Sequence, residues 1–459
     1  MSRGKKLGVL LGILAVVILA IVITAAVTRN KEEKEASSAE KTVATIPSDQ
    51  VTELHWSYDG EQMHFVRRGD TWVNADDESF PADEDLLNNM LNSLSEVKSY
   101  KSISGSADRS DYGLEPAVVE IAVTADKEYS LKLGNETSID GSVYASMDDG
   151  KIFLTDSILK SQFARKTMSL LKKETVPEMD SVQSMEIRSG DKTISLEYDD
   201  SSSRSWDDSY VWFAADGGNT VTLDTDKSEG LIQTIKYLQW TDTVAYPADE
   251  SQLSAYGLAE PAYAVLLSYT GEDGDKETLQ VDIGNKTEDG YCYGTFHGSD
   301  RIYRTDGTVY DDLAAANIQD LRPDDVLKMD WNSVKSMDLI LDETAYPMTR
   351  IQKKDTVEEA SKEGETWEWN YEDRTVDLTE ALEALTGLTA ESMDPATPEG
   401  DTAIAFLIER NTANYPQVQL TIWELDEEYY GITLNGEHRL KISREKMDPV
   451  IEQFQNAIK

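Results

Sequence analysis

The segments DYGLEPAVVEIAV at 111–123 and AYGLAEPAYAVLL at 255–267 are two versions of one stretch of chain. Each carries Tyr-Gly-Leu from its second residue, reaches a proline within a few residues and continues with alternating apolar and polar residues. Such alternation is typical of a half-buried β-strand, because successive side chains point to opposite faces of a sheet. The pair therefore indicates a duplicated β-rich unit.

The two copies continue to agree downstream. SLKLGNETSIDGSVYASM from Ser130 and LQVDIGNKTEDGYCYGTF from Leu279 share Gly-Asn-x-Thr, Asp-Gly and a tyrosine in the same order. We expect the tyrosine and leucine of the motif to pack, the glycine to bend the backbone and the proline to start a strand. A structural role is favoured over a binding site. The motif residues are Tyr112, Gly113, Leu114, Pro116, Gly134 and Asn135 in one copy, and Tyr256, Gly257, Leu258, Pro261, Gly284 and Asn285 in the other.

Upstream of the motif, a second pattern occurs three times. Two alternating strands precede a tryptophan-bearing strand, at Trp72, at Trp212 and at Trp367 or Trp369. An amphipathic helix follows, because apolar residues recur three and four positions apart behind acidic residues that suit a helix N-terminus. The apolar faces comprise Leu86, Leu87, Met90, Leu91, Leu94 and Val97; Leu231, Ile232, Ile235 and Leu238; and Leu378, Leu382 and Leu385.

The third copy diverges after its helix. It lacks Tyr-Gly-Leu, although YYGITLNGEHRLKIS from Tyr429 resembles the hairpin YASMDDGKIFLTD from Tyr144. Short hairpin turns imply antiparallel pairing. We therefore predict an α+β fold, in which an N-terminal transmembrane helix is followed by tandem repeats of antiparallel β-sheet with covering amphipathic helices. The expected organisation is a cytoplasmic tail at 1–6, a membrane anchor at 7–27, a flexible linker at 28–45, repeat 1 at 46–174, repeat 2 at 175–322 and a divergent repeat 3 at 323–459.

The anchor is predicted from the uncharged stretch between Leu7 and Val27. Its 21 residues span about 31 Å as a helix, which matches the roughly 30 Å hydrocarbon core of a bilayer. A signal peptide usually has a shorter apolar region, although Ala25 and Ala26 keep cleavage as the alternative. Cationic residues before the stretch favour a cytoplasmic N-terminus. We therefore expect a single-pass protein of the cell membrane whose bulk is extracytoplasmic.

Charge and cysteine content limit the partners and the chemistry. Apart from Arg3, Lys5 and Lys6, the chain holds 40 basic and 87 acidic residues, a balance of −47. Such a charge repels polyanions, so nucleic acid is not an expected partner. A single cysteine, Cys292, allows no intrachain disulfide and is expected to be a packing thiol.

No catalytic or metal-binding pattern is recognised in the sequence. The histidines His55, His64, His297 and His438 fit no metal-ligand spacing. The acidic residues from Asp224 begin like a calcium loop but lack its glycine and its final glutamate, so helix capping explains them better. We predict no catalytic residues, no cofactor and no metal.

The Tyr-Gly-Leu…Pro segment, the glycine-terminated strand and the aromatic hairpin, all behind an N-terminal anchor, resemble the domain-of-unknown-function 4340 family. The resemblance covers most of 47–321 and extends weakly into the third copy. It implies a bacterial, membrane-attached extracytoplasmic protein. Members of the family are often encoded beside ABC-type exporter components, which implies an accessory role, and the family has no established catalytic residues.

Three functions stay open at this point. The first is a non-enzymatic accessory or binding subunit that contacts ABC-type transporter subunits or another envelope complex. The second is a module that binds cell-wall polysaccharide through aromatic side chains, which favour sugar stacking where they are exposed. The third is an envelope hydrolase, which would require a clustered acid–base pair in a cleft.

Overall fold

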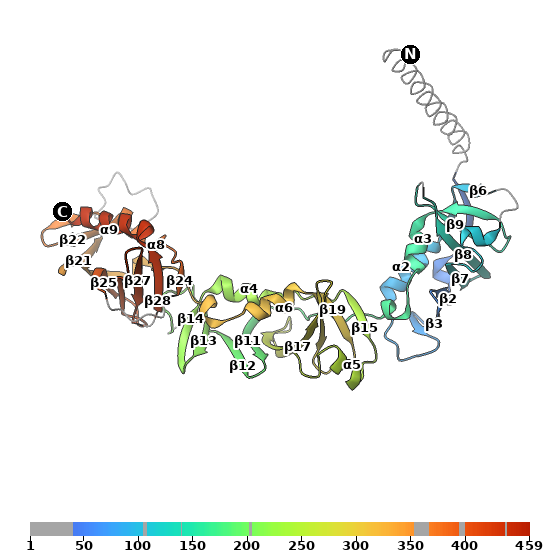
Figure 1. The fold of residues 1–459 in the computed structure, drawn as a ribbon, viewed down its shortest axis with the longest axis horizontal. Coiled ribbons are helices and arrows are strands. Elements are labelled where there is room, and N and C mark those ends of the chain that lie inside the picture. Colours follow the sequence, from blue (N-terminus) through green and yellow to red (C-terminus); the bar gives the residue numbers. More distant parts are fainter. Residues whose placement is uncertain are drawn as a thin grey trace, which may run out of the picture. The chain divides into compact units, whose positions relative to one another are not determined.

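The computed structural model describes residues 40–103, 108–138, 140–201, 204–352, 367–393, 400–436 and 438–459. They form three large antiparallel sheets and one two-stranded sheet, with helices packed against the large sheets (Figure 1). The predicted α+β class with antiparallel sheets is confirmed. The expected anchor at 7–27 lies outside the described residues, and none of the helices inside them is long and apolar enough to cross a membrane.

Repeat 1 holds an eight-stranded sheet in the order β4-β3-β2-β7-β8-β9-β10-β6. Helices α2 (Glu84–Leu94) and α3 (Ser157–Phe163) pack on it. The side chain of Asp83 caps α2 by accepting a hydrogen bond from the backbone N–H of Leu86 at 2.9 Å. The strands are β2 (Glu53–Tyr58), β3 (Glu61–Arg68), β4 (Thr71–Asn74), β6 (Lys101–Ile103), β7 (Val119–Thr124), β8 (Glu128–Glu136), β9 (Val143–Met147) and β10 (Ile152–Thr155), with 3-10 turns η1 (Ser48–Gln50), η2 (Arg109–Tyr112) and η3 (Thr167–Leu170).

The end of the predicted flexible linker is ordered instead. Residues Lys41–Thr45 form strand β1, which pairs antiparallel with β5 (Glu96–Ser99). Its sequence KTVAT alternates weakly, and most of its side chains stay exposed. Backbone pairing with β5 orders this strand, although its few apolar residues do not indicate a strand. The expected linker boundary at residue 45 is therefore wrong.

Repeat 2 holds a nine-stranded sheet in the order β14-β13-β12-β11-β16-β17-β18-β19-β15. Helices α4 (Thr225–Lys236), α6 (Thr308–Ala315) and α7 (Ile318–Leu321) accompany it, and the short α5 (Glu250–Ala255) precedes the Tyr-Gly-Leu motif. The strands are β11 (Ser181–Ser189), β12 (Lys192–Tyr198), β13 (Trp212–Asp216), β14 (Asn219–Leu223), β15 (Asp242–Ala245), β16 (Tyr263–Thr270), β17 (Lys276–Lys286), β18 (Tyr291–Phe296) and β19 (Ile302–Asp306).

Repeat 3 has the same arrangement, in the order β23-β22-β21-β20-β25-β26-β27-β28-β24. Helices α8 (Thr379–Thr386) and α9 (Arg444–Ile458) lie on one side of this sheet (Figure 1). The strands are β20 (Val334–Leu341), β21 (Thr344–Gln352), β22 (Trp367–Tyr371), β23 (Arg374–Val376), β24 (Ser392–Met393), β25 (Thr402–Arg410), β26 (Gln417–Glu424), β27 (Tyr429–Leu434) and β28 (His438–Ser443), and the turn η4 (Trp331–Ser333) precedes β20.

Strand register makes the three repeats comparable residue by residue. The first hairpin closes at Tyr58–Glu61, at Ser189–Lys192 and at Leu341–Thr344. Counted from these turns, Arg67, Tyr198 and Arg350 occupy the same position in the second strand of each hairpin. Their partners on the next strand are Trp72, Trp212 and Trp369, respectively. Of the two tryptophans predicted for the third copy, Trp369 is therefore the equivalent one.

Each large sheet has one face packed against helices, and its central strands leave the opposite face open, although in repeat 2 α5 and the Tyr-Gly-Leu segment cover one end of that face with a small apolar cluster of Ala245, Leu258 and Ile302. In β7 the burial alternates, with Val119, Ile121 and Val123 buried and the residues between them exposed or half-buried. The central strands β16 and β25 carry the same inward-facing series, which packs beneath the helices. The opposite face keeps mostly polar side chains, as expected for an antiparallel sheet covered on one side.

Repeats 2 and 3 belong to one compact unit, Thr175–Lys459. The connection between β12 and β13 carries Trp206 and Tyr210 into the core of repeat 3. The Tyr210 hydroxyl donates to Asp325 Oδ2 at 2.7 Å, and Nη1 of the buried Arg410 donates to the Trp206 carbonyl oxygen at 2.6 Å. Burial and the Asp325 carboxylate raise the pKa of Tyr210, so the hydroxyl keeps its proton. In repeat 1 the matching connection is the two-residue turn at Gly69 and Asp70, which has no room for such an insertion.

Candidate functional site

The Tyr-Gly-Leu motif lies at the junction between the sheet and the turn that leads into β7 or β16. In repeat 1 it follows η2, and Gly113 ends that turn with a φ of +67°. In repeat 2 it follows α5, and Gly257 has a φ of +74°. A positive φ is strained for residues with a side chain, so both glycines meet a backbone requirement. Leu114 and Leu258 are buried, whereas Pro116 is exposed and Pro261 half-buried, each ahead of its strand.

The second half of the motif packs directly against the first. A Cβ atom on Gly134 would lie 2.1 Å from the carbonyl oxygen of Tyr112, and one on Gly284 would lie 2.3 Å from that of Tyr256. The backbone N–H of Asn285 donates to the same Tyr256 oxygen at 2.9 Å. Any side chain on these glycines would force the two segments apart.

An aromatic pair completes the junction in both repeats. The rings of Tyr112 and Tyr144 have centroids 4.6 Å apart, and those of Tyr256 and Tyr293 are 4.5 Å apart, each pair tilted by 53°. Asn135 and Asn285 lie beside Gly113 and Gly257. The structure thus brings each set of predicted motif residues together, in two sites of the same geometry.

Repeat 3 fills the same register positions with other residues. The cross-strand pair Val119–Leu133 of repeat 1 corresponds to Ile404–Ile422 of repeat 3. One residue further along the strand, Gly134 therefore corresponds to Trp423. On the next strand, Tyr144 corresponds to Gly431. A Cβ on Gly431 would lie 2.3 Å from Cζ2 of Trp423, which shows that the indole lies flat over this glycine. The sequence match between Tyr429 and Tyr144 is therefore out of register by two residues.

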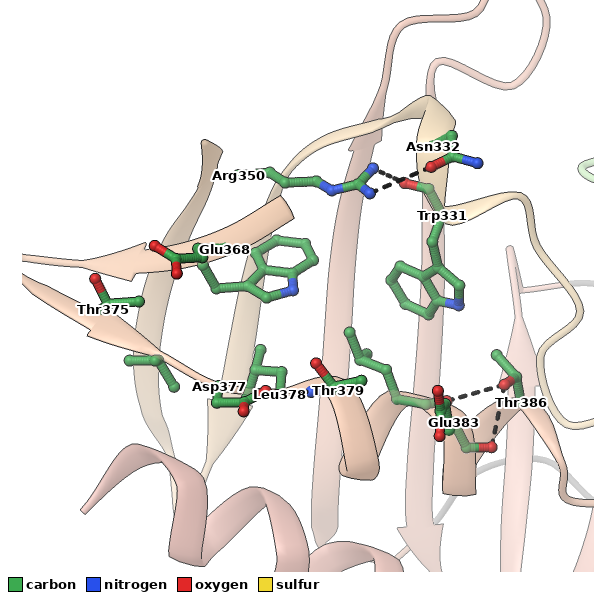
Figure 2. Close-up of a pocket in the computed structure, with 13 residues that line it drawn as sticks. Trp331, Asn332, Arg350, Glu368, Thr375, Asp377, Leu378, Thr379, Glu383 and Thr386 are labelled. Atoms are coloured by element: carbon green, nitrogen blue, oxygen red, sulfur yellow. Dashed lines mark hydrogen bonds between the residues drawn. The ribbon is translucent and has the colours of Figure 1, made fainter. Parts of the chain in front are cut away.

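A pocket of about 520 Å³ opens in repeat 3 between η4, the β22–β23 hairpin and α8. Figure 2 shows Trp331 and Asn332 on one side, Glu368 and Thr375 on the other, and residues of the start of α8 between them. Its other lining residues are Arg350, Trp369, Val376, Asp377, Leu378, Thr379, Leu382, Glu383 and Thr386.

The position of Trp331 in this pocket is fixed by Arg350. The guanidinium Nη1 donates to the carbonyl oxygen of Trp331 and, at 3.4 Å, to that of Val334. Trp331 is half-buried, and its ring stands at 83° to that of the buried Trp369, with centroids 6.5 Å apart. Sequence reasoning missed this site, because Trp331, Arg350 and α8 are brought together only by folding.

Two of the histidines, His64 and His297, each lie beside a single carboxylate. His55 and His64 are cross-strand neighbours, and His64 Nε2 lies 2.6 Å from Glu53 Oε1 beside an open hollow of about 550 Å³. His297 Nδ1 lies 2.8 Å from Asp282 Oδ2, and His438 begins β28. Within the described ranges, no three His, Cys, Asp or Glu side chains converge in a way that could hold a metal ion.

The remaining candidates have local structural explanations. Asp224 caps α4 by accepting from the backbone N–H of Lys227 at 2.9 Å. Cys292 is fully buried in β18, and burial raises the pKa of its thiol to about 11. A thiol with so high a pKa is protonated at neutral pH and is a poor nucleophile.

Comparison with known proteins identifies a family but no individual relative. The family model described as "Domain of unknown function (DUF4340)" matches residues 72–250 and 212–403. The two matches start at Trp72 and Trp212, which are register equivalents, so each runs from the tryptophan strand of one repeat into the next repeat. No curated protein and no solved structure matches the chain. Because the two matches together span 72–403, well over half of the sequence, the chain belongs to the DUF4340 family.

Proposed function

We propose that this chain is a membrane-anchored extracytoplasmic protein that acts as a non-enzymatic accessory or binding subunit of an ABC-type exporter or envelope complex. The observation that carries the proposal is the open face repeated on three sheets. An array of modules, each with one packed and one solvent-facing surface, offers large areas for contact with other proteins. The uncharged stretch 7–27 supplies a membrane anchor of suitable length.

The centre of each open face is marked by one equivalent residue. Ala122, Leu266 and Leu407 occupy the same register position in β7, β16 and β25. Their cross-strand neighbours are polar on at least one side, including His55, Glu186 and Asp338. A small or apolar centre with a polar rim is the composition that protein interfaces favour.

Affinity purification of the tagged full-length chain in a mild detergent tests the proposal. We expect transporter subunits to copurify, and recovery of the chain alone would count against an accessory role. Ala122→Lys, Leu266→Lys and Leu407→Lys should then locate the contact, because a buried lysine in an interface has to lose its hydration. At least one of them should abolish copurification without changing the thermal unfolding temperature.

Glu229→Lys is the matched control, since Glu229 is exposed on α4, away from the open face. It should leave copurification unchanged. If none of the three open-face lysines weakens recovery of the partner, these faces are not the contact surface. Resistance of the chain to alkaline extraction from membranes, and its loss on deletion of 7–27, tests the anchor separately.

A further inference from the structure

The pocket of repeat 3 has a residue that the other repeats lack. Counting from the first hairpin, the positions equivalent to Trp331 are Ser48 in repeat 1 and Met179 in repeat 2. Met179 is buried in the core of its repeat, whereas Trp331 remains half-buried at the mouth of the pocket. Repeat 3 therefore places a large aromatic ring where the shared fold does not require one.

In repeat 1 a hydrogen bond joins the tryptophan strand to the helix that follows it. Nε1 of Trp72 donates to Asn88 Oδ1 on α2 at 3.3 Å, which ties the tryptophan strand to the helix. In repeat 3 the equivalent Trp369 faces the shorter helix α8, and the space between them forms the pocket. Its volume of about 520 Å³ lies within the roughly 300–1,000 Å³ of sites for small ligands.

The lining combines an aromatic wall with many hydrogen-bond acceptors. Three carboxylates, those of Glu368, Asp377 and Glu383, border the pocket together with the hydroxyls of Thr375 and Thr379. Among the lining residues that the structure describes, Arg350 is the only cation, and its guanidinium is already bound to the turn that carries Trp331. An anionic ligand would meet net negative charge here, in a chain whose formal charge is −44.

We propose that this pocket binds a neutral glycan. One sugar ring would stack its apolar C–H face on the Trp331 indole, and its hydroxyls would donate to the carboxylates at the rim. Carboxylates accept strong hydrogen bonds from hydroxyl groups, and a flat aromatic ring covers an apolar sugar face without requiring charge. The pocket thus adds a glycan ligand to the protein partners proposed above. Binding itself follows from the pocket, and only the access of the pocket to envelope glycans rests on the proposed extracytoplasmic location.

Binding is measured with the full-length chain in lipid nanodiscs, because sugar-based detergents would compete for the site. The probes are cello- and maltooligosaccharides and N-acetylglucosamine oligomers as neutral glycans, a chitosan oligomer as a cationic glycan and an oligogalacturonate as an anionic one. Titration calorimetry and tryptophan fluorescence should detect at least one neutral glycan. Trp331→Ala should weaken that binding by about tenfold or more, which corresponds to about 1.4 kcal/mol, and Trp331→Phe should restore part of it.

Two further variants separate a site effect from misfolding. Glu383→Gln changes an exposed helix residue at the rim and should also weaken binding, whereas Tyr237→Ala, which alters an exposed aromatic residue of repeat 2, should not. Failure of every neutral glycan to bind would overturn the proposal, as would binding of the chitosan oligomer or the oligogalacturonate alone, or wild-type affinity in Trp331→Ala. Because no transporter subunit is present in this assay, its result is independent of the copurification test.

Discussion

At one register position of the sheet, repeats 1 and 2 carry Gly134 and Gly284, while repeat 3 carries Trp423. Across from it, the order of sizes is reversed, with Tyr144 and Tyr293 in the first two repeats and Gly431 in the third. In repeats 1 and 2 the backbone of the Tyr-Gly-Leu segment occupies the space above the small residue. In repeat 3 the indole of Trp423 lies over the small residue itself.

The comparison shows that the motif is one half of a packing pair. Tyr-Gly-Leu can approach the sheet only where the facing position has no side chain, and a repeat without the segment needs a large side chain to cover its sheet. In repeat 3 the large and the small residue exchange places, and the Trp423 indole packs against Gly431. The third copy is thus divergent in sequence at this site and packs this part of its sheet with a different pair of residues.

Trp423→Gly, which gives repeat 3 the small residue of the other repeats, should have the largest effect. Trp423 is buried, and no Tyr-Gly-Leu segment is present to fill the space it leaves. Truncating a buried tryptophan costs about 3–5 kcal/mol of unfolding free energy. Hydrogen exchange followed by mass spectrometry should show faster exchange in β25–β27, with repeat 1 unchanged as the internal control.

Gly431→Tyr tests the exchange of large and small residues through a double-mutant cycle with Trp423→Gly. Alone, it should destabilise repeat 3, because its Cβ would collide with the Trp423 indole. In the Trp423→Gly background the tyrosine has room, so the two changes should be coupled by about 1–3 kcal/mol. Additive effects in chemical denaturation would refute the size exchange between these two positions.

Gly134→Ala and Gly284→Ala should be next in size. A methyl group at either position would lie 2.1 or 2.3 Å from a backbone carbonyl oxygen, which cannot move as a flexible side chain can. Overpacking of this kind costs about 1–3 kcal/mol. Calorimetry should show each change lowering the unfolding temperature of its own repeat, and Gly230→Ala, at a glycine of α4 with open space around it, should not.

Gly113→Ala and Gly257→Ala should cost somewhat less. The nearest atoms to their Cβ positions are the side-chain amides of Asn135 and Asn285, which can rotate away, so the positive φ is the main penalty. That penalty is about 1–2 kcal/mol for a left-handed residue with a side chain. Adding Asn135→Ala to Gly113→Ala should recover little stability in urea unfolding, and a full recovery would show that the clash dominates.

Tyr144→Leu and Tyr293→Leu should have the smallest effect. Each replacement keeps an apolar side chain but removes the tilted ring pair with Tyr112 or Tyr256. Aromatic pairs contribute about 0.5–1.5 kcal/mol beyond the area they bury. Equal shifts of the two unfolding transitions would support two equivalent junctions, and a shift in one alone would show that the copies differ.

Much of the architecture could be predicted from short-range patterns. Alternation located the strands around the motif, and the leucine spacing before Leu94 located α2, whose N-cap the structure assigns to Asp83. Two kinds of feature escaped this reading. Strand β1 has too few apolar residues to show a period, and the insertion that carries Trp206 into repeat 3 is indistinguishable in sequence from a polar loop.

The site in repeat 3 could not be predicted for a related reason. Trp331, Arg350 and Glu383 are separated by tens of residues and belong to no shared motif. Their approach depends on the hairpin β22–β23 and on the length of α8, which ends at Thr386. The sequence alone does not show which side of a tryptophan ring is buried, nor which residues lie across from the exposed side.

The class of the fold and its repetition can be inferred from local sequence patterns, because side-chain period and turn residues act over a few positions along the chain. The family can be inferred from the sequence as well, through elements that recur in order around Gly134 and Gly284. That Trp423 packs over Gly431 and that Trp331 borders a pocket became visible only in the folded chain. Both features depend on how side chains from strands far apart in sequence fit together. Close packing requires that the space between the strands be filled, but it does not specify which residue fills it.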